Sequence, residues 1–210
     1  HFTDRRQRQM CIRDRNTYTD ATLQTSCKDC NAGESTSGEG KTTCTTCAAG
    51  RFKASGATEC AMCPRGWVRG ADAQTSDTCT RCASGQHQNE TGQAICLPCV
   101  PGKYGSQQGM TECKDCAQNT YTDATLQTSC KNCRAGESTS GEGKTTCTAC
   151  AAGRFKASGA TECEVCPRGW VRGADAPTSD TCTRCAAGQH QNGTGQAICL
   201  PCVPGKSGSQ

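Results

Sequence analysis

The chain has 210 residues, of which 23 are cysteine; hydrophobic residues, cysteine included, make up 33% and aromatic residues 4%. This is too little apolar surface for one large core, because hydrophobic burial has to offset the conformational entropy lost by every ordered residue. The formal net charge is +4, but residues 1–15 hold five of the 23 Lys and Arg and two of the 19 Asp and Glu. The remainder is close to neutral, which argues against nucleic-acid or anionic-membrane partners.

The cysteine content predicts that covalent cross-links supply the order that a core would otherwise supply. A disulfide that closes a loop of about 15 residues contributes roughly 3 kcal/mol in the chain-entropy treatment. Such bridges persist in oxidising compartments, so the composition favours a secreted or cell-surface protein.

The first segment, residues 1–15, differs from everything that follows it. Residues 5–14 match the translated tail of a transposase-based sequencing adapter, and we therefore expect residues 1–15 to be non-native. The competing interpretation is a basic arm or nuclear signal. In this view the absence of a signal peptide carries no information, and membrane attachment would come only through parts missing from this fragment.

From Asn16 onward the chain is a tandem repeat. Cys-x-x-Cys pairs begin at residues 27, 44, 60, 79, 96, 113, 130, 147, 163, 182 and 199, and the same order of spacings returns after 103 residues. Residues 16–107 and 119–210 differ at nine positions. We predict two blocks of short modules, 16–118 and 119–210, the second a truncated copy of the first.

Each module repeats a short pattern, counted here from its opening cysteine. Position three holds glycine in most units, as in Gly50, whereas Asn119 takes this place in another. Asn tolerates positive φ better than other non-glycine residues, so the position predicts a left-handed turn. Position five holds Phe52, His87, Tyr104 or Tyr121, with Trp67 one place early and Ser35 in the weakest unit, and its ring is expected to pack on a neighbouring bridge. The pattern predicts a disulfide-rich tandem array of irregular β-hairpin modules, elongated, with little helix and no large core.

Spacing alone leaves the bridge connectivity open, although it favours one scheme. In that scheme the second cysteine of each pair joins the first cysteine of the next pair; the alternative is crossed pairing, such as Cys27 with Cys44 and Cys30 with Cys47. Cys27 and Cys202 are then expected to be unpaired through truncation. The favoured pairs are Cys30–Cys44, Cys47–Cys60, Cys63–Cys79, Cys82–Cys96, Cys99–Cys113, Cys116–Cys130, Cys133–Cys147, Cys150–Cys163, Cys166–Cys182 and Cys185–Cys199.

The run from Cys99 through Gly102, Tyr104 and Gly109 to Cys113 and Cys116 resembles the ephrin-receptor-like cysteine-rich repeat. It is also similar to the first loop of tumour-necrosis-factor-receptor modules. The resemblance extends over residues 16–210 and implies an extracellular, disulfide-bonded rod without catalytic residues. Two units depart from the pattern: Cys63–Cys79 is wide, and Cys116–Cys130 has Leu126 in place of its second glycine.

Paired Cys-x-x-Cys motifs can also form Cys₄ zinc sites, so an intracellular zinc array is one alternative. Redox activity would need a βαβ frame, which the sequence lacks. No nucleophile with an ordered acid–base partner is visible, and His87 and His190 occupy the aromatic position of their units. The sequence therefore predicts no enzyme activity, no cofactor and no metal site.

Asn89-Glu-Thr91 and Asn192-Gly-Thr194 are N-glycosylation sequons at equivalent places in the two blocks. The function predicted is a non-enzymatic structural, adhesive or spacer rod of a larger surface or secreted protein, with unidentified protein or glycan partners. A ligand-binding receptor ectodomain is the other extracellular alternative. It predicts an exposed patch confined to one block, whereas the differences between the blocks are scattered.

Overall fold

The computed structural model describes residues 16–19, 26–72, 77–175 and 180–205. The segment expected to be non-native, residues 1–15, lies outside the described residues. The chain divides into two compact units, one made of residues 1–98 and 105–113 and the other of residues 99–104 and 114–210. The division at residues 118 and 119 inferred from the repeat stays a prediction.

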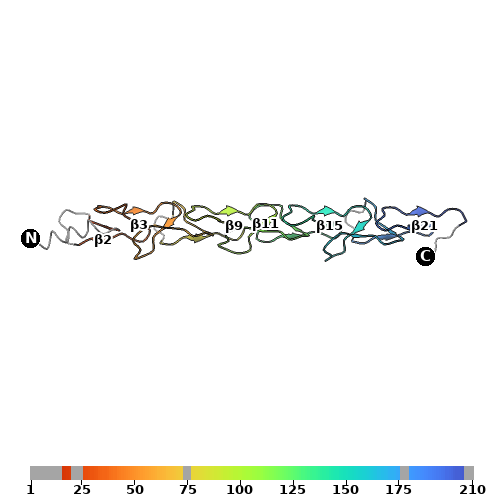
Figure 1. Ribbon diagram of the computed structural model, residues 1–210, viewed down its shortest axis with the longest axis horizontal. Helices are drawn as coiled ribbons and strands as arrows, with labels where there is room; N and C mark the ends of the chain where they lie inside the picture. Colours follow the sequence, from red (N-terminus) through yellow and green to blue (C-terminus); the bar gives the residue numbers. More distant parts are fainter. Residues whose placement is uncertain (1–15, 20–25, 73–76, 176–179, 206–210) are drawn as a thin grey trace, which may run out of the picture. The chain divides into compact units, whose positions relative to one another are not determined.

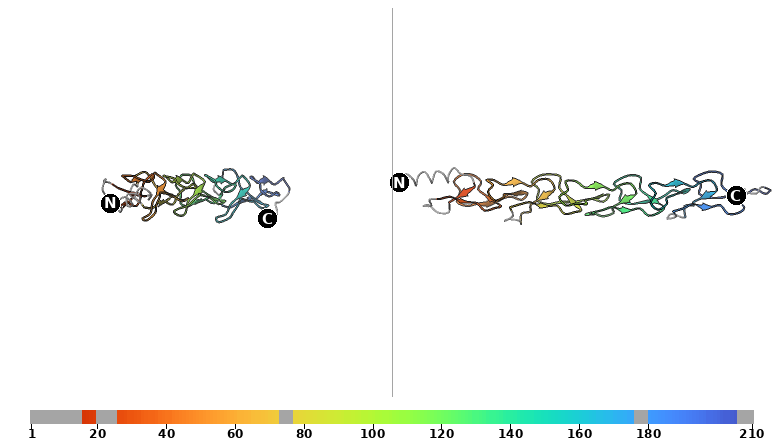
Figure 2. Two further views of the ribbon diagram at one scale, coloured as in Figure 1. Left: turned by 60° about the vertical axis from the view of Figure 1, so that its left-hand side comes forward. Right: turned by 90° about the horizontal axis from the view of Figure 1, so that it is seen from below.

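Every strand in the described residues is two residues long and has one antiparallel partner strand (Figures 1 and 2). Isolated parallel bridges also join Tyr18 to Lys41 and Val171 to Gln196. In the first unit the hairpins are β1 (Thr17–Tyr18) with β2 (Lys28–Asp29), β3 (Glu34–Ser35) with β4 (Thr45–Thr46), β5 (Arg51–Phe52) with β6 (Ala61–Met62), β7 (Trp67–Val68) with β8 (Thr80–Arg81), and β9 (Gln86–His87) with β10 (Leu97–Pro98).

The second unit continues the same series. Its hairpins are β11 (Lys103–Tyr104) with β12 (Lys114–Asp115), β13 (Thr120–Tyr121) with β14 (Lys131–Asn132), β15 (Glu137–Ser138) with β16 (Thr148–Ala149), β17 (Arg154–Phe155) with β18 (Glu164–Val165), β19 (Trp170–Val171) with β20 (Thr183–Arg184), and β21 (Gln189–His190) with β22 (Leu200–Pro201).

The sequence places each hairpin in the same way. The first strand occupies positions four and five of a module, and the second strand is the dipeptide between the two cysteines of a Cys-x-x-Cys pair. A cysteine therefore flanks the second strand on both sides and ties the hairpin to two successive bridges. No helix lies among the described residues, so the expectation of hairpin modules with little helix is confirmed.

Among the described residues the buried apolar side chains are all cysteines, in keeping with the low hydrophobic content. Cys63, Cys82, Cys99, Cys116 and Cys166 are fully buried, whereas side chains such as Met62 and Val165 are about half exposed. The disulfide bridges therefore take the place of a hydrophobic core in each module. Within the described residues no helix has the length and apolar character needed to cross a bilayer.

Candidate functional site: the module interfaces

Nine disulfides with described geometry follow the sequential scheme, in which each module closes on itself. Their loops separate the cysteines by 13 to 16 residues, and their Cα atoms lie 5.6 to 5.8 Å apart. None of the nine is crossed. The pairs are Cys30–Cys44, Cys47–Cys60, Cys63–Cys79, Cys82–Cys96, Cys116–Cys130, Cys133–Cys147, Cys150–Cys163, Cys166–Cys182 and Cys185–Cys199.

The remaining cysteines of the described chain differ in state. Cys99 and Cys113 are also disulfide-bonded. Cys27 is disulfide-bonded as well, so the expectation that it would lack a partner is wrong. That expectation came from setting aside residues 1–15 as non-native. This segment contains Cys11, the one cysteine of the sequence that lies outside the repeat. Cys202 is a free, half-buried thiol.

Successive modules are joined by a backbone hydrogen bond that recurs along the chain. The N–H of the glycine at position three donates to the carbonyl oxygen at position six of the next module, over 2.8 to 2.9 Å. Gly50 donates in this way to Arg69, and Gly153 donates to Arg172. Position three of one module and position six of the next thus provide one of the recurring contacts between neighbouring modules.

A second backbone hydrogen bond joins the same neighbours. In several modules the glycine of the loop that turns back donates its N–H to the carbonyl of the preceding module's opening cysteine. Gly92 donates to Cys63 and Gly195 to Cys166, both over 2.8 Å. Because the opening cysteine is also held by its bridge, this bond fixes the loop of one module against the bridge of another.

Leu126 stands where other modules carry that loop glycine. Its φ is +63°, in the region of Gly92 at +71° and Gly143 at +66°, and its N–H donates to the carbonyl of Cys99 over 3.0 Å. The turn is therefore the same as in the other modules, and the departure noted in the sequence does not change the local backbone. A leucine in this conformation is strained, since its Cβ crowds the following carbonyl.

We expect Leu126→Gly to stabilise the protein. Removing the left-handed strain gains about 1–2 kcal/mol, which the extra backbone freedom of glycine in the unfolded chain reduces to about 1 kcal/mol. The measurement is the midpoint of thermal unfolding with the bridges intact. Leu126→Ala is the matched control, because it keeps Cβ and removes only a side chain that is 49% exposed. Equal stabilisation by both variants would contradict this explanation.

Position three also contacts the module two places further along. A Cβ built on Gly50 would lie 1.9 Å from the carbonyl oxygen of Gly92, and one on Gly153 would lie 2.0 Å from that of Gly195. Gly66 and Gly102 meet Gly109 and Gly143 in the same way, at 2.1 and 2.3 Å. Glycine is needed here for close backbone approach as well as for positive φ.

Asn16 and Asn119 occupy position three with φ values of +71° and +63°, as the glycine pattern predicted. Their side-chain amides donate to carbonyl oxygens of the module two places along, Asn16 to Ala57 over 3.2 Å and Asn119 to Thr161. Both of those modules have the shortest loop, with a sequence separation of 13 between their cysteines. A shorter loop leaves the space that the larger side chain fills.

Position six holds the buried polar residues that the sequence analysis did not identify. Lys53, Arg69, Lys156 and Arg172 are 2 to 4% exposed. The Lys53 ammonium donates to the carbonyls of Cys30 and Asn31 in the preceding module over 3.1 and 3.2 Å. The signal was present in the sequence, because position six is never a large apolar residue, but a single polar residue in a loop is ordinarily solvated.

Arg69 shows how such a side chain holds a neighbour. Its Nη1 atom donates to the carbonyl of Cys47 over 3.0 Å and to that of Arg51 over 2.7 Å. Arg172 repeats these contacts with Cys150 and Arg154 over 3.0 and 2.6 Å. The guanidinium therefore satisfies carbonyls beside a buried bridge that water cannot reach.

We expect Arg69→Ala to destabilise the protein by about 2–4 kcal/mol, because it leaves buried carbonyls without donors and opens a void. The measurement is amide hydrogen exchange around the Cys47–Cys60 module. Arg51→Ala is the control, since Arg51 is exposed and donates only to the carbonyl of Cys60 over 3.2 Å. Exchange that is equally fast in both variants would contradict a role for the buried contacts.

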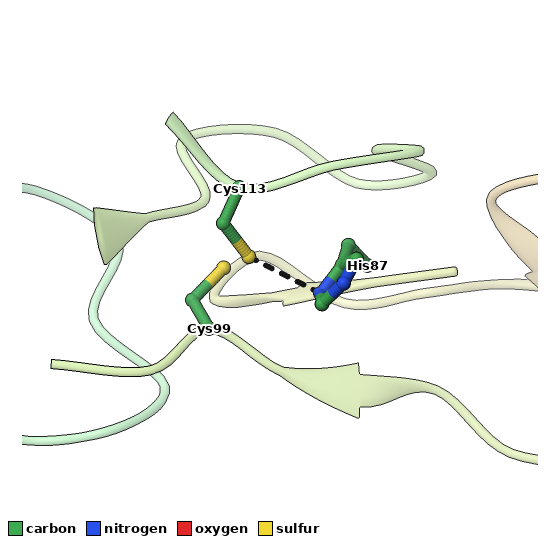
Figure 3. A group of neighbouring side chains, drawn as sticks. All are labelled: His87, Cys99 and Cys113. Atoms are coloured by element: carbon green, nitrogen blue, oxygen red, sulfur yellow. Dashed lines mark hydrogen bonds between the residues drawn. The ribbon is translucent and has the colours of Figure 1, made fainter. Parts of the chain in front are cut away.

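Position five reaches the bridge of the next module, as expected from the sequence. Nδ1 of His87 lies 3.2 Å from Sγ of Cys113 (Figure 3). Ser35 takes the same place and lies 3.1 Å from Sγ of Cys60. Both cysteines drawn in Figure 3 are disulfide-bonded, so neither offers the thiolate that a metal ion requires.

Trp67 sits one place before position five and has a different role. Val68 takes position five, and Trp67 faces Arg81 across the β7–β8 hairpin, with the guanidinium carbon 4.7 Å from the ring centroid. This cation–π contact covers the indole without a core.

An exposed ion pair on the second unit, Lys131 with Asp123, shifts the pKa of both of its groups. Nζ of Lys131 lies 2.8 Å from Oδ1 of Asp123. The hydrogen bond from Lys131 lowers the pKa of Asp123 and the same bond raises the pKa of Lys131. The ion pair therefore stabilises the folded state at pH values between the ordinary pKa values of the two groups. This stabilisation is lost as pH falls through the lowered pKa of Asp123 or rises through the raised pKa of Lys131.

Asp123 also lines an open polar hollow together with Tyr121, Asn132, Arg134 and Glu137. Lys131 engages the Asp123 carboxylate at the edge of this hollow. The two sequons lie elsewhere: Asn89 and Asn192 are exposed and follow the first strands of the β9–β10 and β21–β22 hairpins.

Comparison with known proteins agrees with this architecture. Residues 102–146 match the family model described as tyrosine-protein kinase ephrin type A/B receptor-like. The match begins at position three of the Cys99–Cys113 unit and continues through the two modules that follow. The bridges of the other modules follow the same sequential scheme, with loops that are one residue shorter to two residues longer. No curated protein matches the chain. Ephrin-receptor-like cysteine-rich repeats with this many disulfides point to an extracellular domain.

Proposed function

We propose that this array is a non-enzymatic structural, adhesive or spacer segment in the extracellular part of a larger surface or secreted protein. The observation that carries the proposal is the recurring interface between modules. Positions three and six of neighbouring modules are joined by the same backbone bond from Gly33 to Gln191, except at Asn119, whose N–H donates to the hydroxyl of Thr139 instead. Such an arrangement supplies length and local rigidity with every module.

The same features disfavour the alternative of an intracellular zinc array. A Cys₄ zinc site needs four thiolates, whereas among the described cysteines only Cys202 is not bridged. A ligand-binding ectodomain would need an exposed anchor confined to one block. The exposed residues Ile95 and Leu97 recur as Ile198 and Leu200 in the other block, so this part of the surface does not distinguish the blocks.

We also propose that Asn89 and Asn192 carry N-linked glycans. Each side chain is exposed, as is the threonine two residues later, so an oligosaccharide can be accommodated without displacing a buried group. Secretion from eukaryotic cells is expected to give two mass increments. Asn89→Gln and Asn192→Gln should each remove one of them.

Small-angle X-ray scattering of the oxidised full chain tests the proposal that the array is a spacer. A compact globule of this length would have a radius of gyration of about 17 Å. In the described residues the hydrogen bonds between modules join modules one or two places apart, and a chain with such contacts is expected to have a radius of gyration roughly twice that figure. A value near that of the compact globule would overturn the proposal.

A further inference from the structure

Ile95 and Ile198 are the large hydrophobic side chains most exposed to solvent in the described chain, at 67% and 66%. Each belongs to a loop that begins with a sequon, Asn89-Glu-Thr91 in one and Asn192-Gly-Thr194 in the other. An apolar side chain that is left bare in water is less favourable than one that is covered. What covers them is therefore a question that the structure raises.

A glutamine side chain ties the two ends of each loop together. Nε2 of Gln88 donates to the carbonyl of Ile95 over 2.8 Å, and Oε1 of Gln88 accepts from the N–H of Glu90 over 3.1 Å. Gln88 is only 3% exposed, so the loop is anchored on a buried group. Asn89 directly follows this anchor. Asn89, to which a sugar would be attached, and Ile95 therefore belong to the same loop, whose two ends Gln88 holds together.

The second loop repeats this clamp. Nε2 of Gln191 donates to the carbonyl of Ile198 over 2.9 Å, and Oε1 accepts from the N–H of Gly193 over 3.0 Å. The middle residue of the sequon differs between the two loops, Glu90 in one and Gly193 in the other. The sequon, the clamp and the isoleucine remain together through that difference.

We infer that the first sugars of a glycan on Asn89 and Asn192 pack against Ile95 and Ile198, and so form the cover of this apolar surface. The inference rests on the glycosylation proposed above. N-acetylglucosamine presents C–H faces and an acetyl methyl group beside its hydroxyls, so it can cover an isoleucine and remain hydrated. Because the sugar is tethered to the same clamped loop, its effective concentration at the isoleucine is high.

A protein strand fits this surface less well than a sugar. The strand that follows each isoleucine, β10 or β22, ends in proline, Pro98 or Pro201. Proline has no N–H to donate, so it hinders the addition of a further strand at this edge.

Methyl NMR of the secreted full chain tests the contact. The sequence contains three isoleucines, Ile12, Ile95 and Ile198, so selective labelling of isoleucine methyl groups gives few signals, and Ile95→Val and Ile198→Val assign them. We expect cross-peaks between the Ile95 and Ile198 methyl groups and sugar protons. They should persist when each glycan is trimmed to its first N-acetylglucosamine and disappear when the whole glycan is released.

Asn192→Gln should abolish the cross-peaks of Ile198 alone, and Asn89→Gln those of Ile95 alone. Mass spectrometry of the same samples separates the two ways in which the idea can fail. Glycans present without sugar cross-peaks at either isoleucine would overturn the packing and leave the glycosylation intact. Unmodified Asn89 and Asn192 would overturn both.

Discussion

Gly153→Ala is expected to destabilise the Cys150–Cys163 module by about 3 kcal/mol or more. Its φ of +75° costs an alanine about 1–2 kcal/mol on its own. The added Cβ would also meet the carbonyl oxygen of Gly195 at 2.0 Å, and neither atom belongs to a flexible side chain. Relief of that overlap requires the two modules to separate, at a further cost of about 1–3 kcal/mol.

Hydrogen exchange measures this effect locally, because an array of bridged modules need not unfold in one step. The reporter amide is Gly195, whose N–H donates to the carbonyl of Cys166. A loss of about 3 kcal/mol corresponds to exchange that is roughly 100-fold faster.

Gly159→Ala is the matched control in the same module. Its φ is +83°, but a Cβ there would meet nothing within 4 Å. The control therefore carries the conformational cost without the overlap, and we expect about 1–2 kcal/mol. If the two variants proved equally destabilising, contact with the module two places along would contribute nothing to stability.

The turns and hairpins could be predicted from the sequence because they depend on local chemistry. Position three was expected to need positive φ from Gly50 and its equivalents, and Asn119 at +63° confirms this. The hairpins were predicted because the chain has to return between the two cysteines of each module. The bounds of the strands could not be predicted, since strands of two residues show no alternation of polar and apolar residues.

The contacts between modules could not be predicted, because they join residues that no local pattern connects. Lys53 and Arg69 interact with carbonyls 18 to 23 residues earlier. A lysine or arginine in a loop is ordinarily solvated, and only the stacking of modules removes water from it. The approach of Gly153 to Gly195 likewise depends on how two modules pack, to which the identity of a single glycine gives no clue.

The buried cations also show why these interfaces are specific. Carbonyl oxygens beside a buried bridge need donors, and the module that follows provides them through Lys53, through Arg69 or through a threonine hydroxyl. The threonine is Thr122, whose Oγ1 donates to the carbonyl of Lys103 in the preceding module over 3.3 Å. Polar groups thus determine which modules fit together, while the bridges supply the stability of each.

Complete reduction of the bridges is expected to abolish the fold in every module. The buried apolar side chains of the described chain are cysteines, so no other core remains once the sulfurs are separated. Each loop of 13 to 16 residues would regain the entropy that its bridge had removed, about 3 kcal/mol per bridge. A chain with 33% hydrophobic residues cannot recover this amount by burial.

The measurement is the dispersion of amide NMR signals before and after reduction and alkylation, with an oxidised sample taken through the same steps without reductant. We expect the reduced chain to show the narrow dispersion of a disordered protein, and reoxidation before alkylation to restore the original spectrum. Dispersed signals that persisted in the reduced chain would mean that the bonds at positions three and six hold the modules together without the bridges. Since those bonds join residues three and six places after bridged cysteines, we expect them to be lost in the same transition.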